Sequence, residues 1–153
     1  MTLDEYILRH IDDEGDYLKA LYRDTHLKLL YPRMASGHLQ GRMLKMFVRM
    51  IRPRQILEIG TYSGYSALCM AEGLPDDGML HTFEINDEQE DFTRPWLENS
   101  PYAGKIKFYI ATPWSLCPGW ESLSTLLLST AISAVTSIIM KWCWRVFRKE
   151  AIS

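Results

Sequence analysis

The sequence predicts an α/β protein in which a parallel sheet follows a group of N-terminal helices. Beyond residue 53, short apolar runs alternate with amphipathic segments, which is the pattern of βαβ units in a parallel sheet. Before residue 53, apolar residues recur at helical spacing and no strand-like run appears. A glycine-bearing turn after the first apolar run opens the next helix, as in folds that bind nucleotide cofactors.

The N-terminal third is expected to be helical. Residues 3–30 fit one or two amphipathic helices, because apolar residues recur there every three or four positions. Pro32 interrupts this pattern, and a further helix from Leu39 to Ile51 ends before Pro53. The apolar face predicted for that helix consists of Leu39, Met43, Leu44, Phe47 and Val48.

Three strands and two helices are predicted between residues 55 and 110. In chain order they are Gln55 to Ile59 (strand), Ser63 to Glu72 (helix), Leu80 to Ile85 (strand), Asp87 to Asn99 (helix) and Lys105 to Ile110 (strand). Thr61 or Ser63 is placed to cap the first of these helices with its hydroxyl. From Ala111 to Ser153 the apolar residues follow neither the helical nor the strand period.

Composition narrows the class of protein. The formal net charge of −2 over 153 residues predicts no broad basic surface, so nucleic acid is not an expected partner. The three cysteines are widely spaced and fit neither a metal site nor a disulfide framework, which indicates reduced thiols in the cytoplasm. The first ten residues include two acids and lack a continuous apolar core, so they do not form a secretory signal.

One segment raises the alternative of a membrane anchor. Residues 122–140 carry no charge and precede a basic stretch, and their length is just sufficient to span a bilayer. Serine and threonine make up eight of its 19 residues, which makes it a marginal span on a transfer scale. A membrane partner is therefore not expected, although an anchor through 122–140 stays as an alternative hypothesis.

The segment Ile56 to Ser66 has the composition of a cofactor-binding turn. Gly60 allows backbone angles closed to other residues and lets a ligand approach closely, and the following helix offers free N–H groups. Glu84 ends the next strand about 20 residues later, where a carboxylate can accept hydrogen bonds from ribose hydroxyls. Glu58 is a carboxylate inside an apolar strand and therefore needs a partner.

Structural roles remain open for each of these residues. Glu58 could serve to cap a nearby backbone N–H. Glu84 could be a solvated acid at a strand end, and Gly60 and Gly64 could simply form a tight turn.

The stretch LEIGTYSGYSALCMAEGLPDDGMLHTFEIN (residues 57–86) resembles the cofactor motif of the caffeoyl-CoA and catechol type O-methyltransferases, which use S-adenosylmethionine. The upstream MASGHLQG (residues 34–41) resembles the segment of that family that lies over the cofactor. The resemblance implies that Glu58, Gly60 and Ser66 meet the amino-acid end of the cofactor, and that Glu84 binds its ribose. The full set of implied cofactor-binding residues is Met34, Ser36, Glu58, Gly60, Tyr62, Gly64, Ser66 and Glu84.

The resemblance implies a Rossmann-like fold and methyl transfer from S-adenosylmethionine to a hydroxyl of a small catechol-like acceptor. In the intact family a divalent metal, Mg²⁺, assists; a metal-binding aspartate follows a fourth strand, and a further Asp-Asn pair follows on the next strand. No such cluster occurs after Ile110, so the chain is expected to be a truncated methyltransferase with no catalytic or metal-binding residue of its own and little activity. A non-catalytic cofactor-binding or partner-binding module is the alternative, and a homodimer is compatible with the family.

The genetic code suggests an origin for this ending. If one base was lost before codon 111, reading the codons one base earlier permits Gly-Asp-Ala-Leu at Ala111 and Phe-Asp-Leu-Ala-Phe-Ile-Asp-Gly from Leu123. In the same earlier frame, the codons of residues 140–144 can encode only Glu, then Met or Val, then Val and Leu. The codons near Lys149 permit Gly-Gly. The residues permitted by the earlier frame resemble the sequence that follows the third strand in the family. We therefore interpret residues 1–110 as N-terminal helices plus the cofactor-binding half of the domain, and 111–153 as a frameshifted tail.

Overall fold

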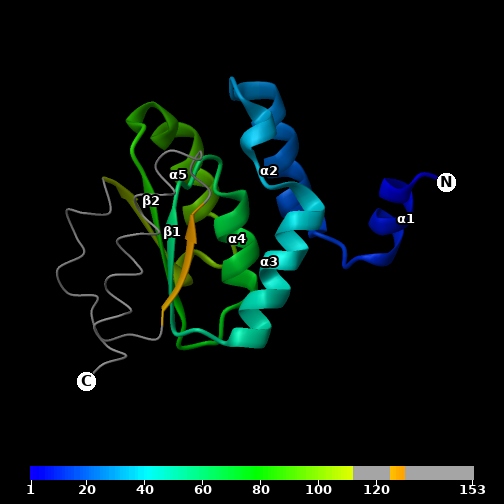
Figure 1. The fold of residues 1–153 in the computed structure, drawn as a ribbon. Helices are drawn as coiled ribbons and strands as arrows, with labels where there is room; N and C mark the ends of the chain where they lie inside the picture. The colour runs from blue at the N-terminus through cyan, green and yellow to red at the C-terminus, as the bar shows by residue number, and fades with distance from the viewer. Residues whose placement is uncertain (112–124, 130–153) are drawn as a thin grey trace.

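The computed structural model describes residues 1–111 and, as backbone, the strand at 125–129. Four parallel strands form one sheet in the order β3-β2-β1-β4 (Figure 1). Their bounds are Gln55–Ile59 (β1), Met79–Glu84 (β2), Ile106–Ile110 (β3) and Thr125–Ser129 (β4). The α/β fold with a parallel sheet is thereby confirmed.

The register of β1 with both neighbours places the carboxyl ends of the strands at one edge of the sheet. Glu58 lies opposite Thr82 of β2 and Leu128 of β4. Loops that leave β1 and β2 therefore meet at this edge, which is where ligands bind in open parallel sheets.

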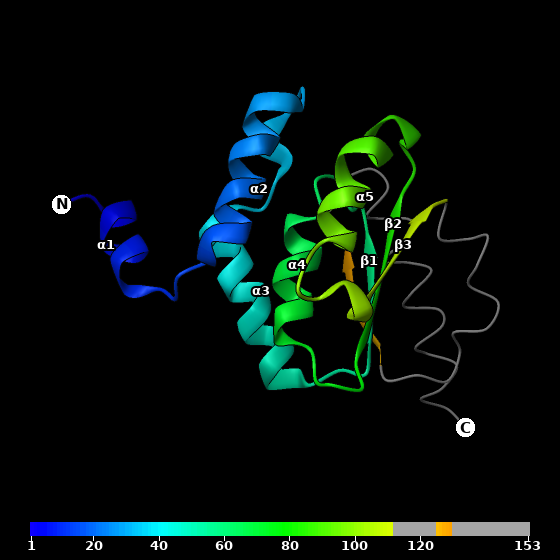
Figure 2. The same ribbon diagram turned by 180° about the vertical axis from the view of Figure 1, so that it is seen from behind.

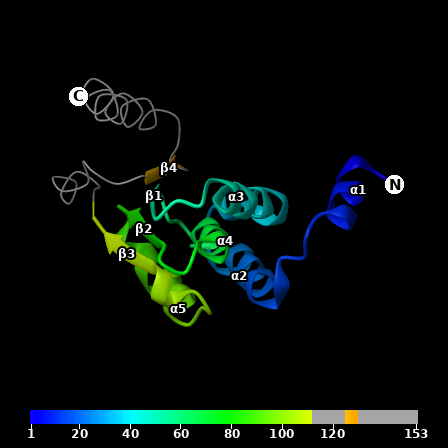
Figure 3. The same cartoon turned by 90° about the horizontal axis from the view of Figure 1, so that it is seen from below.

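Five α-helices precede or connect the strands. They are Leu3–His10 (α1), Gly15–Lys28 (α2), Gly37–Ile51 (α3), Tyr65–Gly73 (α4) and Glu90–Glu98 (α5), with short 3₁₀ turns at Pro32–Met34, Asp87–Gln89 and Ala103–Lys105. Seen along the sheet, α2, α3, α4 and α5 lie on one side of it (Figure 3). Helix α1 stands apart from this layer at the N-terminal end of the chain (Figure 2).

Helix α4 forms the centre of the core. Its residues from Tyr65 to Ala71 are all buried, because the sheet lies on one side and α2 and α3 lie on the other. Helix α3 approaches it closely at Gly41, where a Cβ would lie 2.6 Å from Cys69 Sγ. Only a residue without a side chain fits at this crossing.

The face predicted for α3 is correct at Leu44 and Val48, which pack in the core, but wrong at its other three residues. Leu39, Met43 and Phe47 are 40%, 44% and 42% exposed. Besides Val48, the buried residues of α3 are Gly41, Arg42 and Lys45, which the apolar pattern did not predict. The close approach at Gly41 turns that side of α3 toward α4, although apolar periodicity alone favours the neighbouring side.

Other boundaries differ from the predictions in smaller ways. Neither Thr61 nor Ser63 caps α4. Gly64 occupies the cap position with φ +83° and makes no side-chain hydrogen bond. The segment predicted as one helix from Asp87 to Asn99 begins with a 3₁₀ turn before α5.

The region after Ile110 contains a strand that the apolar pattern did not predict. Strand β4 pairs with β1 inside the segment considered as a membrane anchor, which disfavours a spanning helix there. No described helix is long and apolar enough to cross a membrane. The rest of the expected frameshifted tail, 112–124 and 130–153, lies outside the described residues.

Candidate cofactor site

The loop between β1 and α4 takes backbone angles that favour glycine. Gly60, Tyr62 and Gly64 have φ values of +94°, +49° and +83°. The N–H groups of Gly60 and Thr61 both donate to the carbonyl oxygen of Phe83, at 2.9 and 3.1 Å. The loop is thus fastened to the end of β2. The sequence-based expectation that Gly60 takes angles closed to other residues is confirmed.

Gly64 is needed for a second reason. A Cβ at this position would lie 2.9 Å from Leu97 Cδ2 of α5. The left-handed angle and this contact together exclude larger residues where the loop enters α4. Gly64 therefore shapes the loop from behind and is not among the residues that line the cleft described below.

Tyr62 links the loop to two other elements. Its N–H donates to Glu84 Oε2 at 2.9 Å, and its carbonyl oxygen accepts from Thr93 Oγ1 at 2.5 Å. The buried phenol lies beside the backbone of Tyr31, and burial raises the pKa of the Tyr62 hydroxyl. The two hydrogen bonds of its backbone can hold a non-glycine residue in the left-handed region at modest cost.

Glu84 closes the site at the end of β2. Besides Tyr62, the N–H groups of Ile85 and Asn86 donate to its Oε1 at 2.9 and 3.1 Å. An ionised carboxylate has about four acceptor sites, so capacity remains for a ligand hydroxyl. Glu84 is therefore not a solvated strand-end acid, since it is 8% exposed and its carboxylate organises the loop.

Glu58 is fully buried behind the loop. Ser66 Oγ donates to its Oε1 at 2.5 Å and Thr82 Oγ1 donates to its Oε2 at 2.6 Å. Burial raises the pKa of the Glu58 carboxyl to about 7, against the lowering effect of these two hydroxyls. Its partners are side-chain hydroxyls, not the backbone N–H that the structural alternative proposed. Glu58 supports Ser66 and is not itself on the cleft wall.

The segment 34–36 lies over the loop. Met34, Ala35 and Ser36 line one side of a small cleft, and the opposite side is formed by residues 60–63, 65 and 66. The cleft measures about 10 Å³, which is the space of a single water at most. Of the eight predicted residues, Met34, Ser36, Gly60, Tyr62 and Ser66 line the cleft, and Glu58, Gly64 and Glu84 surround it.

Some residues of the site were not predicted. Thr82 bonds both Glu58 and Thr61, the latter at 2.6 Å between hydroxyl oxygens, and Thr93 anchors Tyr62. One sequence signal for Thr82 is that it is a polar residue in an otherwise apolar strand. In the structure it lies opposite the buried acid Glu58. Among the described residues, no three His, Cys, Asp or Glu side chains lie close enough together to hold a metal ion.

The O-methyltransferase family model matches residues 9–116. Catechol O-methyltransferase from Mus musculus is 32% identical over 123 residues, which cover 76% of this chain and 46% of that protein. Caffeoyl-CoA O-methyltransferase 2 from Petunia hybrida is 38% identical over 95 residues, covering 62% of this chain and 39% of that protein. The chain thus spans less than half the length of these relatives.

Solved structures agree with this fold. The O-methyltransferase TomG from Streptomyces achromogenes, in complex with SAM, aligns with a TM-score of 0.81 at 23% identity over 94% of this chain and 66% of its own. An O-methyltransferase from Bacillus cereus in complex with SAH aligns at 0.64 and 26% identity over 70% of this chain and 48% of its own. The chain belongs to the S-adenosylmethionine-dependent O-methyltransferase family, and the resemblance seen in its sequence is confirmed.

Proposed function

We propose that the loop from Gly60 to Ser66 and the acid Glu84 bind S-adenosylmethionine, with Met34 and Ser36 over the bound cofactor. The main support for the proposal is the hydrogen bond between the loop and this acid, which the Tyr62 N–H donates to the Glu84 carboxylate at 2.9 Å. This bond holds a carboxylate with spare acceptor capacity beside a turn that a ligand can approach closely. Relatives solved with SAM and SAH support the choice of ligand.

Each implied residue would do a defined part of the binding. Glu84 would accept hydrogen bonds from the ribose hydroxyls, and Gly60 would leave room for the amino-acid end. The Ser66 hydroxyl, which donates to Glu58 at 2.5 Å in this structure, would turn its single proton toward the cofactor carboxylate. Because the cleft is only about 10 Å³, the segment 34–36 must move away from the loop before a ligand of this size enters.

Titration of S-adenosylhomocysteine into the full 153-residue chain by calorimetry tests this site. Wild type is expected to bind, and Gly60→Val is expected not to, because a branched side chain disfavours the +94° φ angle and fills the approach to the loop. Gly104→Val is the matched control, since a Cβ at Gly104 meets nothing within 4 Å. Equal binding by wild type and Gly60→Val contradicts the proposal, as does a folded wild type that binds nothing.

For the reaction, we propose methyl transfer to a hydroxyl of a small catechol-like acceptor with help from a divalent metal. S-adenosylmethionine supplies an electrophilic methyl group; the acceptor oxygen forms the new C–O bond as the C–S bond breaks, and the hydroxyl proton leaves to a base. The protein's share is to hold the cofactor in line with the acceptor. The catechol and caffeoyl-CoA relatives support this acceptor class.

We further propose that the 153-residue chain has little activity, because residues 111–153 are read in a shifted frame. In support, β4 coincides with the stretch for which the earlier frame permits Asp-Leu-Ala-Phe-Ile, and the second Asp comes directly after it. Its parallel pairing beside β1 is the place where a sheet of this order continues. The test is to measure the methylation of catechol by the frame-restored protein and by the present chain, each with and without Mg²⁺. This comparison tests the proposed activity, its dependence on the metal and the shifted reading frame.

A further inference from the structure

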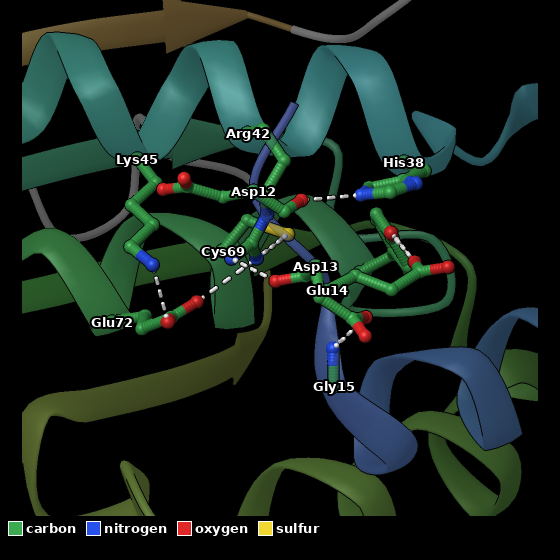
Figure 4. A network of polar contacts seen from close by, with 10 residues as sticks. Asp12, Asp13, Glu14, Gly15, His38, Arg42, Lys45, Cys69 and Glu72 are labelled. Atoms are coloured by element: carbon green, nitrogen blue, oxygen red, sulfur yellow. Dashed lines mark hydrogen bonds and ion pairs between the residues drawn. The ribbon is translucent and has the colours of Figure 1, made fainter. Parts of the chain in front are cut away.

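Two buried cationic side chains of α3 contact a single acid on α4 (Figure 4). Arg42 Nη2 lies 2.9 Å from Glu72 Oε2, and Lys45 Nζ lies 2.6 Å from Glu72 Oε1. Arg42 and Lys45 are 6% and 8% exposed. Buried charges are costly unless they are paired, so one carboxylate shared by two cations leaves a surplus positive charge.

The remaining contacts of Arg42 do not balance that charge. Its Nη1 donates to the carbonyl oxygen of Asp13 at a long 3.4 Å, and its Nη2 lies 3.6 Å from Cys69 Sγ. Burial raises the pKa of the Cys69 thiol to about 12, so this neighbour is neutral. Arg42 Nε is buried and has no hydrogen-bond partner among the described residues. Buried donors without a partner are rare in proteins.

A cavity of about 240 Å³ adjoins these two cations. It is lined by Arg42, Lys45 and Arg49 together with Asp12, Met46 and Met50. The three cations follow one another at intervals of three and four residues, which places them on the same side of α3. With the two acids Asp12 and Glu72 set against these three cations, one positive charge remains in surplus around the cavity. None of these residues lines the cleft at the cofactor loop, so the two sites are separate.

We propose that this cavity binds a small organic oxyanion, a phosphate or a carboxylate that carries a short apolar group. The oxyanion offsets the surplus positive charge around the cavity and accepts from Arg49, and the apolar group packs against Met46 and Met50. Guanidinium and ammonium groups form short, charge-assisted hydrogen bonds with such oxygens. The two methionines are flexible and adapt to apolar groups of different shape.

The test uses the full chain and phenyl phosphate as the probe, with inorganic phosphate and chloride at matched ionic strength for comparison. Phenyl phosphate is expected to raise the melting temperature saturably and more than either comparison ion. Arg49→Gln, at an exposed position, and Lys45→Met are each expected to weaken phenyl phosphate binding at least tenfold. Lys28→Met is the matched control, because Lys28 pairs with Asp24 on the surface of α2.

Lys45→Met makes a second prediction without any ligand. It leaves Arg42 and Glu72 as a balanced pair, so in anion-free buffer the variant should melt no lower than wild type. If Lys45→Met fails to fold, Arg49→Gln still decides the binding question. The proposal is wrong if phenyl phosphate shifts wild type and Arg49→Gln equally, if chloride gives the same shift, or if no saturable shift occurs. S-adenosylhomocysteine should not compete with phenyl phosphate, which keeps this test independent of the cofactor site.

Discussion

The Tyr62 N–H donates to Glu84 Oε2 at 2.9 Å and so joins two segments that lie 22 residues apart in the sequence. Tyr62 belongs to the loop after β1, and Glu84 is the last residue of β2. Because Ile85 and Asn86 also donate to the same carboxylate, the acid fixes the backbone around the proposed ribose position. One side chain therefore fixes the shape of the loop and, in the proposed function, also binds the ligand.

Replacing Glu84 is expected to reduce both stability and cofactor affinity. Glu84→Ala leaves three backbone N–H groups without their acceptor, which should lower the free energy of unfolding by about 1–3 kcal/mol. Loss of the ribose contact should weaken S-adenosylhomocysteine binding by about 1.5–3 kcal/mol, or roughly tenfold to a hundredfold. Urea unfolding and calorimetry measure the two effects. Undiminished binding by Glu84→Ala would show that the ribose is held elsewhere.

Three glycine-to-alanine substitutions separate backbone strain from steric contact. Gly64→Ala has both a φ of +83° and a Cβ 2.9 Å from Leu97 Cδ2, Gly15→Ala has only the φ of +79°, and Gly104→Ala has neither. We expect losses of about 2–4 kcal/mol for Gly64→Ala, about 1–2 kcal/mol for Gly15→Ala and no loss for Gly104→Ala. Urea unfolding gives the order, and equal losses at Gly64 and Gly15 would mean that α5 moves to accept the methyl group.

Much of this architecture follows from local pattern. Strands β1 to β3, the turn at Gly60 and the acid at the end of β2 were predicted, because each of them is determined by a short stretch of sequence. The partners of Glu58 were not predicted, since Thr82 meets it only through the register of two strands. Strand β4 was missed because its five residues occupy a stretch with no clean apolar period.

The burial of α3 shows where apolar periodicity fails. The pattern favoured the side with Leu39 and Phe47, but a glycine on another side lets two helices approach closely. Gly41 brings Arg42 and Lys45 into the interior, where Glu72 meets them. In this helix, charged residues close to a glycine indicate a buried ion cluster. A prediction of the buried face from apolar residues alone does not detect it.

The pKa of Glu58 predicts how stability depends on pH. Burial raises this pKa from 4.5 to about 7, so the folded state holds the proton over a range in which the unfolded state has lost it. The contribution of Glu58 to the free energy of unfolding therefore falls as pH rises from about 4.5 to about 7, by on the order of 3 kcal/mol. In Glu58→Gln this fall should be absent, so the stability of the variant relative to wild type should increase with pH. Glu98→Gln, on the surface of α5, is the control for urea unfolding at pH 5 to 8.

His81 acts in the opposite direction. Burial and the neighbouring charge of Lys107 lower its pKa from 6.5 to about 4. The unfolded state then binds more protons between these values, so the contribution of His81 to stability rises with pH from about 4 to 6.5. In wild type the two groups offset each other between pH 4.5 and 6.5. His81→Gln should consequently show a steeper loss of stability with rising pH than wild type, and an unchanged slope would contradict the assignment.

The gene itself tests the interpretation of residues 111–153. Restoring one base just before codon 111 is expected to open a frame that encodes Gly-Asp-Ala-Leu and then Phe-Ile-Asp-Gly. The forced codons at Met140 to Trp144 must then give Glu, Met or Val, Val and Leu. In the restored frame the second aspartate falls at codons 129 and 130, just past the end of β4. Sequencing the locus decides the matter, because a stop codon within about a dozen codons, or an unrelated sequence, leaves the present frame as the true one.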